Sequence, residues 1–136
     1  MRILALDHGE ARVGVAVCDP TETIARPAGV LGPDPAEVLQ LASELEAELV
    51  IVGLPLTLAG SEGQQAQSAR AYGAELERLL DVPVETYDER LTTRMADSST
   101  RAGAGAAPDA LAAAHLLESY LQRRAGSAPD QGQAKP

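Results

Sequence analysis

The sequence ILALDHGEARVGVAVC, residues 3–18, decides the fold of this chain. Its first four residues are apolar, as is typical of a central strand buried on both faces. The chain then turns, and residues 12–18 alternate valines with other side chains, which predicts a second strand paired to the first as a hairpin. Asp7 lies at the rim of this hairpin beside Gly9 and Gly14, and glycines let a ligand approach the backbone closely. We expect Asp7 to hold either a metal ion or a phosphate-bearing ligand.

Strands and helices alternate along the middle of the chain. Residues 23–31 predict a third, weaker strand, and a proline within it favours the edge of a sheet. Further elements are expected as a helix at residues 36–47, a strand at 49–52, a helix that opens with a capping box of Ser61 and Gln64 and ends near residue 80, and a strand at 82–87. Because helices separate the first, fourth and fifth strands, these three should run parallel.

The last third of the chain contains a predicted helix between two less regular segments. A short helix is expected after Thr92, and the Gly/Ala-rich residues 98–107 are expected to be mobile. Pro108 should begin the final helix, which we end at Arg124, because proline is favoured in a first turn. Residues 125–136 are polar and contain Pro and Gly, so we expect a disordered tail after one α/β domain of residues 1–124.

Acidic residues gather at one edge of the predicted sheet. The carboxyl ends of the parallel strands carry Asp7, Gly53 and Glu89, and ligands of open sheets bind at that edge. The start of the last helix can add Asp109. Carboxylates favour Mg²⁺ or Mn²⁺, and two such ions roughly 4 Å apart can activate water and stabilise the leaving oxygen of a phosphodiester. Phosphodiester hydrolysis is the predicted reaction, while a solvated turn for Glu89 and a favourable helix dipole for Asp109 are the structural alternatives.

The composition argues against several other classes of protein. A net charge of −9 is unlike that of a protein that grips nucleic acid with its whole surface. With three Tyr and neither Phe nor Trp, base stacking on an aromatic platform is not expected. One cysteine excludes an internal disulfide or a cysteine zinc site and fits a reducing compartment. Because no run reaches membrane-spanning length and no signal segment opens the chain, we expect a cytoplasmic protein without a membrane partner.

Four blocks of the sequence together resemble one known family. They are LDHGEARVGVA at residues 6–16, GLPLTLAGSEG at 53–63, DERLTT at 88–93 and DALAAAHLLESYL at 109–121. In order and spacing they resemble the YqgF/RuvX family over about residues 1–124. The resemblance implies a ribonuclease H-like α/β fold, similar to RuvC-type Holliday junction resolvases. Its five-stranded mixed sheet should have three antiparallel strands, then two parallel strands, with helices on both faces.

The resemblance also implies roles for individual residues. Asp7, Glu89 and Asp109 would be the catalytic acids and would bind Mg²⁺ or Mn²⁺. Since adjacent strand residues point to opposite sides, we expect Glu89 to face Asp7, and Asp88 to face Arg90 or a helix N-terminus. The resemblance implies that Arg12 contacts the phosphates of the substrate, and that Arg90 either does the same or anchors the acidic turn. The residues themselves suggest two further substrate contacts, Ser61 and Arg94.

Some positions depart from the family pattern. Ala11 stands where the family often has Lys, and Ala112 stands where RuvC-like enzymes commonly have another metal ligand. Residues 57–59 also replace the more usual Asn- and Asp-containing sequence. These differences predict weaker binding of metal or substrate.

The implied function is metal-dependent endonuclease cleavage in the 5′ maturation of precursor 16S rRNA. The alternative is a Holliday junction resolvase acting on branched DNA. An ATP-binding actin-like domain, which would need a second lobe, and a catalytically silent binding module are the rivals from other classes. Expected partners are precursor rRNA or branched DNA and a ribosomal particle, with both a monomer and a homodimer left open.

Overall fold

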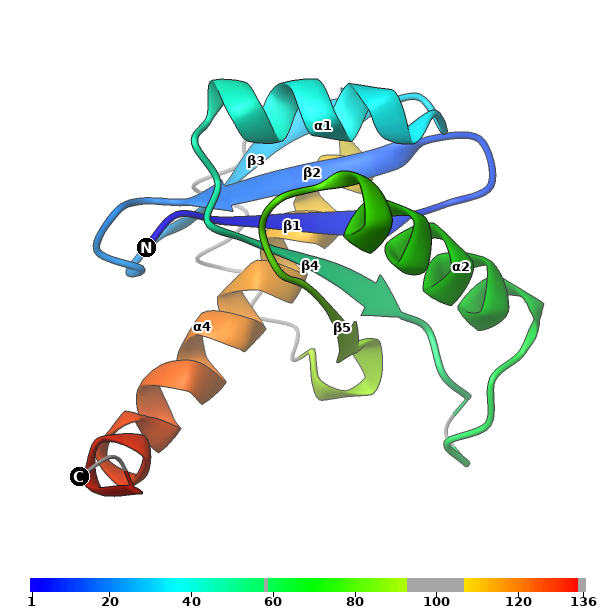
Figure 1. Ribbon diagram of the computed structural model, residues 1–136. Helices are drawn as coiled ribbons and strands as arrows, with labels where there is room; N and C mark the ends of the chain where they lie inside the picture. Colours follow the sequence, from blue (N-terminus) through cyan, green and yellow to red (C-terminus); the bar gives the residue numbers. More distant parts are fainter. Residues whose placement is uncertain (58, 93–106, 135–136) are drawn as a thin grey trace.

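The computed structural model describes residues 1–57, 59–92 and 107–134, and in the last of these ranges it describes side chains as far as residue 126. The chain forms one α/β unit (Figure 1). Its elements are β1 (Ile3–His8), β2 (Val13–Cys18), β3 (Ala25–Leu31), α1 (Pro35–Glu44), β4 (Leu49–Leu54), α2 (Gln64–Leu79), β5 (Val84–Asp88), the 3₁₀ turn η1 (Glu89–Leu91) and α4 (Pro108–Ala134).

The five strands form one mixed sheet in the order β3-β2-β1-β4-β5. Pairing is antiparallel between β1 and β2 and between β2 and β3, and parallel between β1 and β4 and between β4 and β5. The proline-containing β3 lies at an edge of the sheet, as expected. The predicted arrangement of three antiparallel strands followed by two parallel strands is therefore confirmed.

Helices cover both faces of the sheet, so the core has two layers (Figure 1). Along β1, Leu4 and Leu6 pack on the side of α1 and α2, while Ile3 and Ala5 pack on the side of α4. The same alternation continues to the end of the strand, which places Asp7 on the α4 side and His8 on the α2 side. One strand thus directs consecutive residues to opposite sides of the same sheet edge.

The two helices on one side begin in different ways. Asp34 caps α1, its carboxylate accepting a hydrogen bond from the backbone N–H of Ala36. Helix α2 begins after Gly63, without a side-chain cap, so the predicted capping box of Ser61 and Gln64 is wrong. The reason is local: the Ser61 hydroxyl lies 2.8 Å from the hydroxyl of Thr57, inside the loop that precedes the helix.

Helix α4 covers the other face of the sheet and is longer than predicted. It begins at Pro108, as expected, but runs to Ala134, so its predicted end at Arg124 is wrong. Leu121 is the last fully buried residue described in it, and residues 122 and 123 are exposed. Among the described side chains of α4, which end at residue 126, Leu121 is therefore the last one anchored by burial, and the division of the chain near residue 124 stays a prediction.

Some expectations fall outside the described residues. These are the short helix after Thr92, the mobility of most of residues 98–107, and the position of Arg94. Within the described residues, no helix has the length and apolar character needed to cross a membrane.

Candidate nuclease site

Two of the predicted acids meet at the carboxyl ends of parallel strands. Asp7 is the fifth residue of β1, and Glu89 begins η1 directly after β5. Strand β4 lies between them and is parallel to both, so its neighbours end at the same edge of the sheet. The Asp7 and Glu89 carboxyl groups are hydrogen-bonded to each other. The predicted meeting of these two side chains is therefore present in the fold.

This close approach changes the protonation of both groups. Burial, the charge of Asp7 and the hydrogen bond to Asp7 raise the pKa of Glu89 to about 7. Burial also raises the pKa of Asp7, and the nearby charge of Asp109 adds to this effect. Glu89 thus holds the shared proton more tightly and donates it to an ionised Asp7. Charging both of these half-buried carboxyl groups at neutral pH is therefore unfavourable unless a cation lies beside them.

A glycine in β4 makes room for Glu89. A Cβ atom at Gly53 would lie 2.5 Å from Oε2 of Glu89 and 3.1 Å from a methyl carbon of Leu116. Any other residue at this position would therefore push the carboxyl group away from Asp7. The sequence pattern placed Gly53 at the same sheet edge as Asp7 and Glu89. The structure shows that its lack of a side chain leaves space for the Glu89 carboxyl group.

A second glycine brings in the third acid. Gly14 pairs with Asp7 across β1 and β2, and a Cβ atom at Gly14 would overlap the backbone carbonyl of Asp109. The first turn of α4 can therefore lie directly on β2 only because position 14 has no side chain. We expected Gly14 to admit a ligand; instead, it admits the segment of the protein that carries Asp109.

Arg12 contacts Asp109 from the hairpin turn. Its Nε lies 2.7 Å from Oδ2 of Asp109, and the two side chains are 67% and 39% exposed. An ion pair this exposed is worth only about 0.2–1 kcal/mol and can exchange partners at little cost. Arg12, the expected phosphate contact, thus lies beside the candidate site, where its guanidinium is paired with the carboxylate of Asp109.

Asp88 and Arg90 organise the turn that carries Glu89. The Asp88 carboxylate accepts hydrogen bonds from the backbone N–H of Arg90 and from its guanidinium, with Nη2 2.6 Å from Oδ2. Asp88 therefore points away from the shared proton and toward Arg90, as expected from strand alternation. These contacts fit the prediction that Arg90 anchors the acidic turn.

A buried pair of hydroxyl groups ties this turn to α4. The Ser119 hydroxyl donates to the backbone carbonyl of Leu91 at 2.9 Å and lies 2.8 Å from the hydroxyl of Tyr87. Ser119 is only 3% exposed, and Tyr87 immediately precedes Asp88 and Glu89. We did not anticipate this link. The signal for it was a serine within the apolar stripe of α4.

Ser61, another predicted substrate contact, is less central. It is exposed and bonded to Thr57, in a loop closed by pairing between Leu56 and Glu62. Gly60 places this loop close to the Arg90 guanidinium, because a Cβ at Gly60 would lie 3.3 Å from Nη1. The loop therefore borders η1, whereas the Ser61 side chain is engaged with Thr57 rather than with the three acids.

The chemistry of the acids bears on whether they can hold a metal. Among the described residues, no three or more Asp, Glu, His or Cys side chains are gathered tightly enough to hold a metal ion as they stand. Asp7 and Glu89 supply paired oxygen donors, while Asp109 is turned to Arg12. The proton shared by Asp7 and Glu89 marks a place where positive charge is needed. The donor set fits a hard divalent cation, with Asp109 as the residue that has to exchange partners.

Known structures share this architecture. A structure of Thermus thermophilus RuvC with a Holliday junction substrate matches 93% of this chain and 97% of that chain, with a TM-score of 0.67 at 15% identity. The fowlpox virus Holliday junction resolvase matches 90% of this chain and 99% of its own, with a TM-score of 0.53 at 13% identity. Likeness at such low identity establishes the fold, which is that of RuvC, as expected.

Sequence relatives are much closer. A protein of Anaeromyxobacter sp. (strain Fw109-5), named "Putative pre-16S rRNA nuclease", is 42% identical over 135 residues, covering 91% of this chain and 98% of the relative. A protein of the same name from Natranaerobius thermophilus is 38% identical, covering 91% and 96%. The family described as "RuvX: Holliday junction resolvase" matches residues 1–123. This chain therefore belongs to the RuvX family.

Proposed function

We propose that this protein is a divalent-metal-dependent nuclease that hydrolyses phosphodiester bonds. Its active site would be formed by Asp7, Glu89 and Asp109. One observation carries the proposal: because Gly14 and Gly53 have no side chains, the Glu89 carboxyl group can reach Asp7, and the first turn of α4, which carries Asp109, can lie on β2 next to Asp7. Close acids oppose folding unless a cation neutralises them. Membership of a nuclease family supports the same conclusion.

We assign the metal, Mg²⁺ or Mn²⁺, to Asp7 and Glu89, with Asp109 as the third ligand. When two such ions are bound, they would activate a water molecule and stabilise the leaving oxygen. The chain's own part is to orient the acids. Glu89 gives up the proton it shares with Asp7, and Asp109 exchanges Arg12 for the metal. Arg12 then carries a guanidinium that can donate to a phosphate oxygen of the substrate.

For the substrate, we propose precursor 16S rRNA, cut during its 5′ maturation in the cytoplasm. The names of the relatives support this assignment. The net charge of −9 also supports it, because a protein this acidic gains little from the phosphates of a free, extended duplex. A ribosomal particle would supply the additional contacts. The remaining proposed substrate contacts are Arg90 in the acidic turn, Ser61 in the neighbouring loop, and Arg94, which lies outside the described residues.

Cleavage of a four-way DNA junction is the second candidate, favoured by the family's description and by the likeness to RuvC. A resolvase makes paired symmetric cuts and needs a two-fold dimer. Side-by-side assays on a precursor 16S rRNA 5′ leader and a four-way junction, at the same salt and metal concentration, separate the two. Paired nicks in the junction without any cut in the RNA would reverse our choice.

The test of the active site is Asp7→Asn. We expect loss of nearly all cleavage, because an amide cannot supply a bridging carboxylate, and an unchanged or slightly higher melting temperature, because a repulsive charge is removed. Asp81→Asn is the matched control: Asp81 is exposed and precedes β5, at the opposite end from Glu89. Full cleavage by folded Asp7→Asn protein would refute the assignment.

A further inference from the structure

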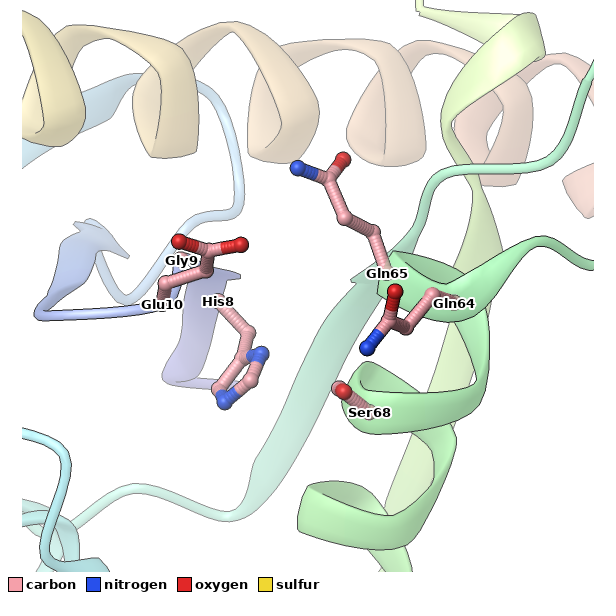
Figure 2. A pocket seen from close by; sticks show the side chains of 6 residues that line it. All are labelled: His8, Gly9, Glu10, Gln64, Gln65 and Ser68. Atoms are coloured by element: carbon pink, nitrogen blue, oxygen red, sulfur yellow. The ribbon is translucent and has the colours of Figure 1, made fainter.

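A pocket lies at the same sheet edge as the acids, between the β1–β2 turn and the start of α2. Its volume is about 320 Å³, at the small end of ligand sites. Figure 2 shows residues of the turn facing residues of the helix across an open space. The lining residues are His8, Gly9, Glu10, Gln64, Gln65 and Ser68. The pocket has room for one small group, and a double helix cannot enter it.

The side chains that line the pocket are polar, and none of them is Lys or Arg. Gln64, Gln65 and Ser68 each combine hydrogen-bond donors with acceptors. Glu10 is the acidic residue of this lining. A phosphate group would therefore face a carboxyl group and would find neither Lys nor Arg in this lining. The chemistry therefore favours a neutral, planar group with donors and acceptors along its edge, which describes a nucleobase.

His8 supplies a flat surface at this pocket. Its ring packs against the ring of Tyr72, with centroids 4.5 Å apart and an angle of 35° between the planes. Tyr72 is 7% exposed and lies within α2, so the imidazole rests on a rigid support. Histidine rings stack on unpaired bases in RNA-binding sites. In a chain without Phe or Trp, this half-buried ring can take the place of an aromatic platform.

The pocket stands in a fixed relation to the acids. His8 follows Asp7 directly, so their Cα atoms lie about 3.8 Å apart, and strand alternation sends their side chains to opposite faces of the sheet. A single strand bound at the acids can therefore cross the sheet edge and place a neighbouring base against His8. The base in the pocket would belong to a nucleotide next to the cleaved phosphate.

We propose that this pocket binds one unpaired nucleobase flanking the scissile phosphate. The enzyme would thus require a single-stranded nucleotide beside its cut. This inference rests on the proposed nuclease function for the location of the cut, while the pocket's preference for a base follows from its own lining. Gln64, Gln65 and Ser68 would contact the base edge, and His8 its face.

The test combines abasic substrates with pocket variants in a binding assay. Fluorescence anisotropy with the Asp7→Asn protein measures binding without cleavage, using labelled single-stranded RNA and DNA in which each base in turn is removed. We expect one abasic position to weaken binding roughly tenfold, as losing one base contact does in single-strand-binding proteins. In the Gln65→Ala/Ser68→Ala variant, the same abasic change should weaken binding by only about twofold or less. The RNA and DNA series show which nucleic acid supplies the base.

Gln67→Ala is the matched control. Gln67 lies on the same turn of α2 and is exposed but does not line the pocket, so this variant should keep the full abasic penalty. An abasic series without any sensitive position, or a penalty unchanged by the pocket variants, would overturn the proposal. If the wild-type protein cuts nucleic acid but its binding does not depend on any base, the proposed nuclease function is supported and the proposed base-binding pocket is refuted. The reverse pattern, base-dependent binding without cleavage of any substrate, would remove the nuclease function alone.

Discussion

Removing the Ser119 hydroxyl should cost much more stability than removing its partner on Tyr87. Serine has one hydroxyl proton, and a carbonyl can only accept, so that proton belongs to the 2.9 Å bond to Leu91. Tyr87 must therefore be the donor in the 2.8 Å contact. Ser119→Ala leaves the Tyr87 hydroxyl and the Leu91 carbonyl without partners, at about 1–3 kcal/mol each and so about 2–6 kcal/mol together, and less if water reaches the partly buried carbonyl. Tyr87→Phe breaks only one bond and should cost about 0.5–1.5 kcal/mol.

Urea unfolding of the two variants and the double variant measures this difference. The double variant should be no less stable than Ser119→Ala, because the tyrosine hydroxyl that had lost its partner is then absent as well. Ser43→Ala, an exposed serine in α1, serves as the control and should stay within about 0.5 kcal/mol of wild type. A Tyr87→Phe cost equal to or above that of Ser119→Ala would refute the proposed direction of the hydrogen bonds.

Three further outcomes follow from the same structure. Gly14→Ala should displace the start of α4 and lower both stability and cleavage, while Gly63→Ala, with open space around its Cβ, should do neither; melting curves and cleavage rates compare them. The raised pKa of Glu89, about 7 against an ordinary 4.5, means that the folded state keeps a proton which the unfolded chain releases between these values. The contribution of Glu89 to stability should therefore be full below about pH 4.5 and be lost as the pH rises through about 7, and Glu89→Gln should flatten the decline in melting temperature between these pH values. Deleting residues 125–136 should change the melting temperature by no more than about 2 °C, because Leu121 is the last buried side chain among the described residues of α4; a loss of many degrees would show that the tail packs on the domain.

Patterns that repeat along the chain were sufficient to predict the sheet. Alternation in β2 and apolar runs in β1 and β4 indicated strands, since each pattern reports burial over several residues, and a proline indicated that β3 lies at an edge. Alternation also separated Glu89 from Asp88. Predictions based on one or two residues were less secure. The capping box failed because the Ser61 hydroxyl had a nearer partner in Thr57, a contact that no spacing rule encodes.

Long-range packing was the other limit. The sequence marked Gly14 as a place of close approach, but only the assembled sheet shows that the approaching group is the backbone of Asp109. Ser119 is 28 residues from Leu91, so nothing local predicts that these two are bonded. The length of α4 was missed because Gly126 and Pro129, which usually end helices, lie inside it.

These contacts favour a functional over a structural explanation of the acids. A structural ion pair would place Asp7 or Glu89 beside a basic side chain. The arginines of this region instead form ion pairs with Asp88 and Asp109. The fold keeps two half-buried carboxyl groups and their shared proton at the sheet edge, where burial and mutual repulsion work against stability. Proteins keep such costly arrangements mainly where activity needs them. The proposed role of His8 fits the same pattern: its polar ring is held on Tyr72 at the edge of the pocket, one residue from Asp7.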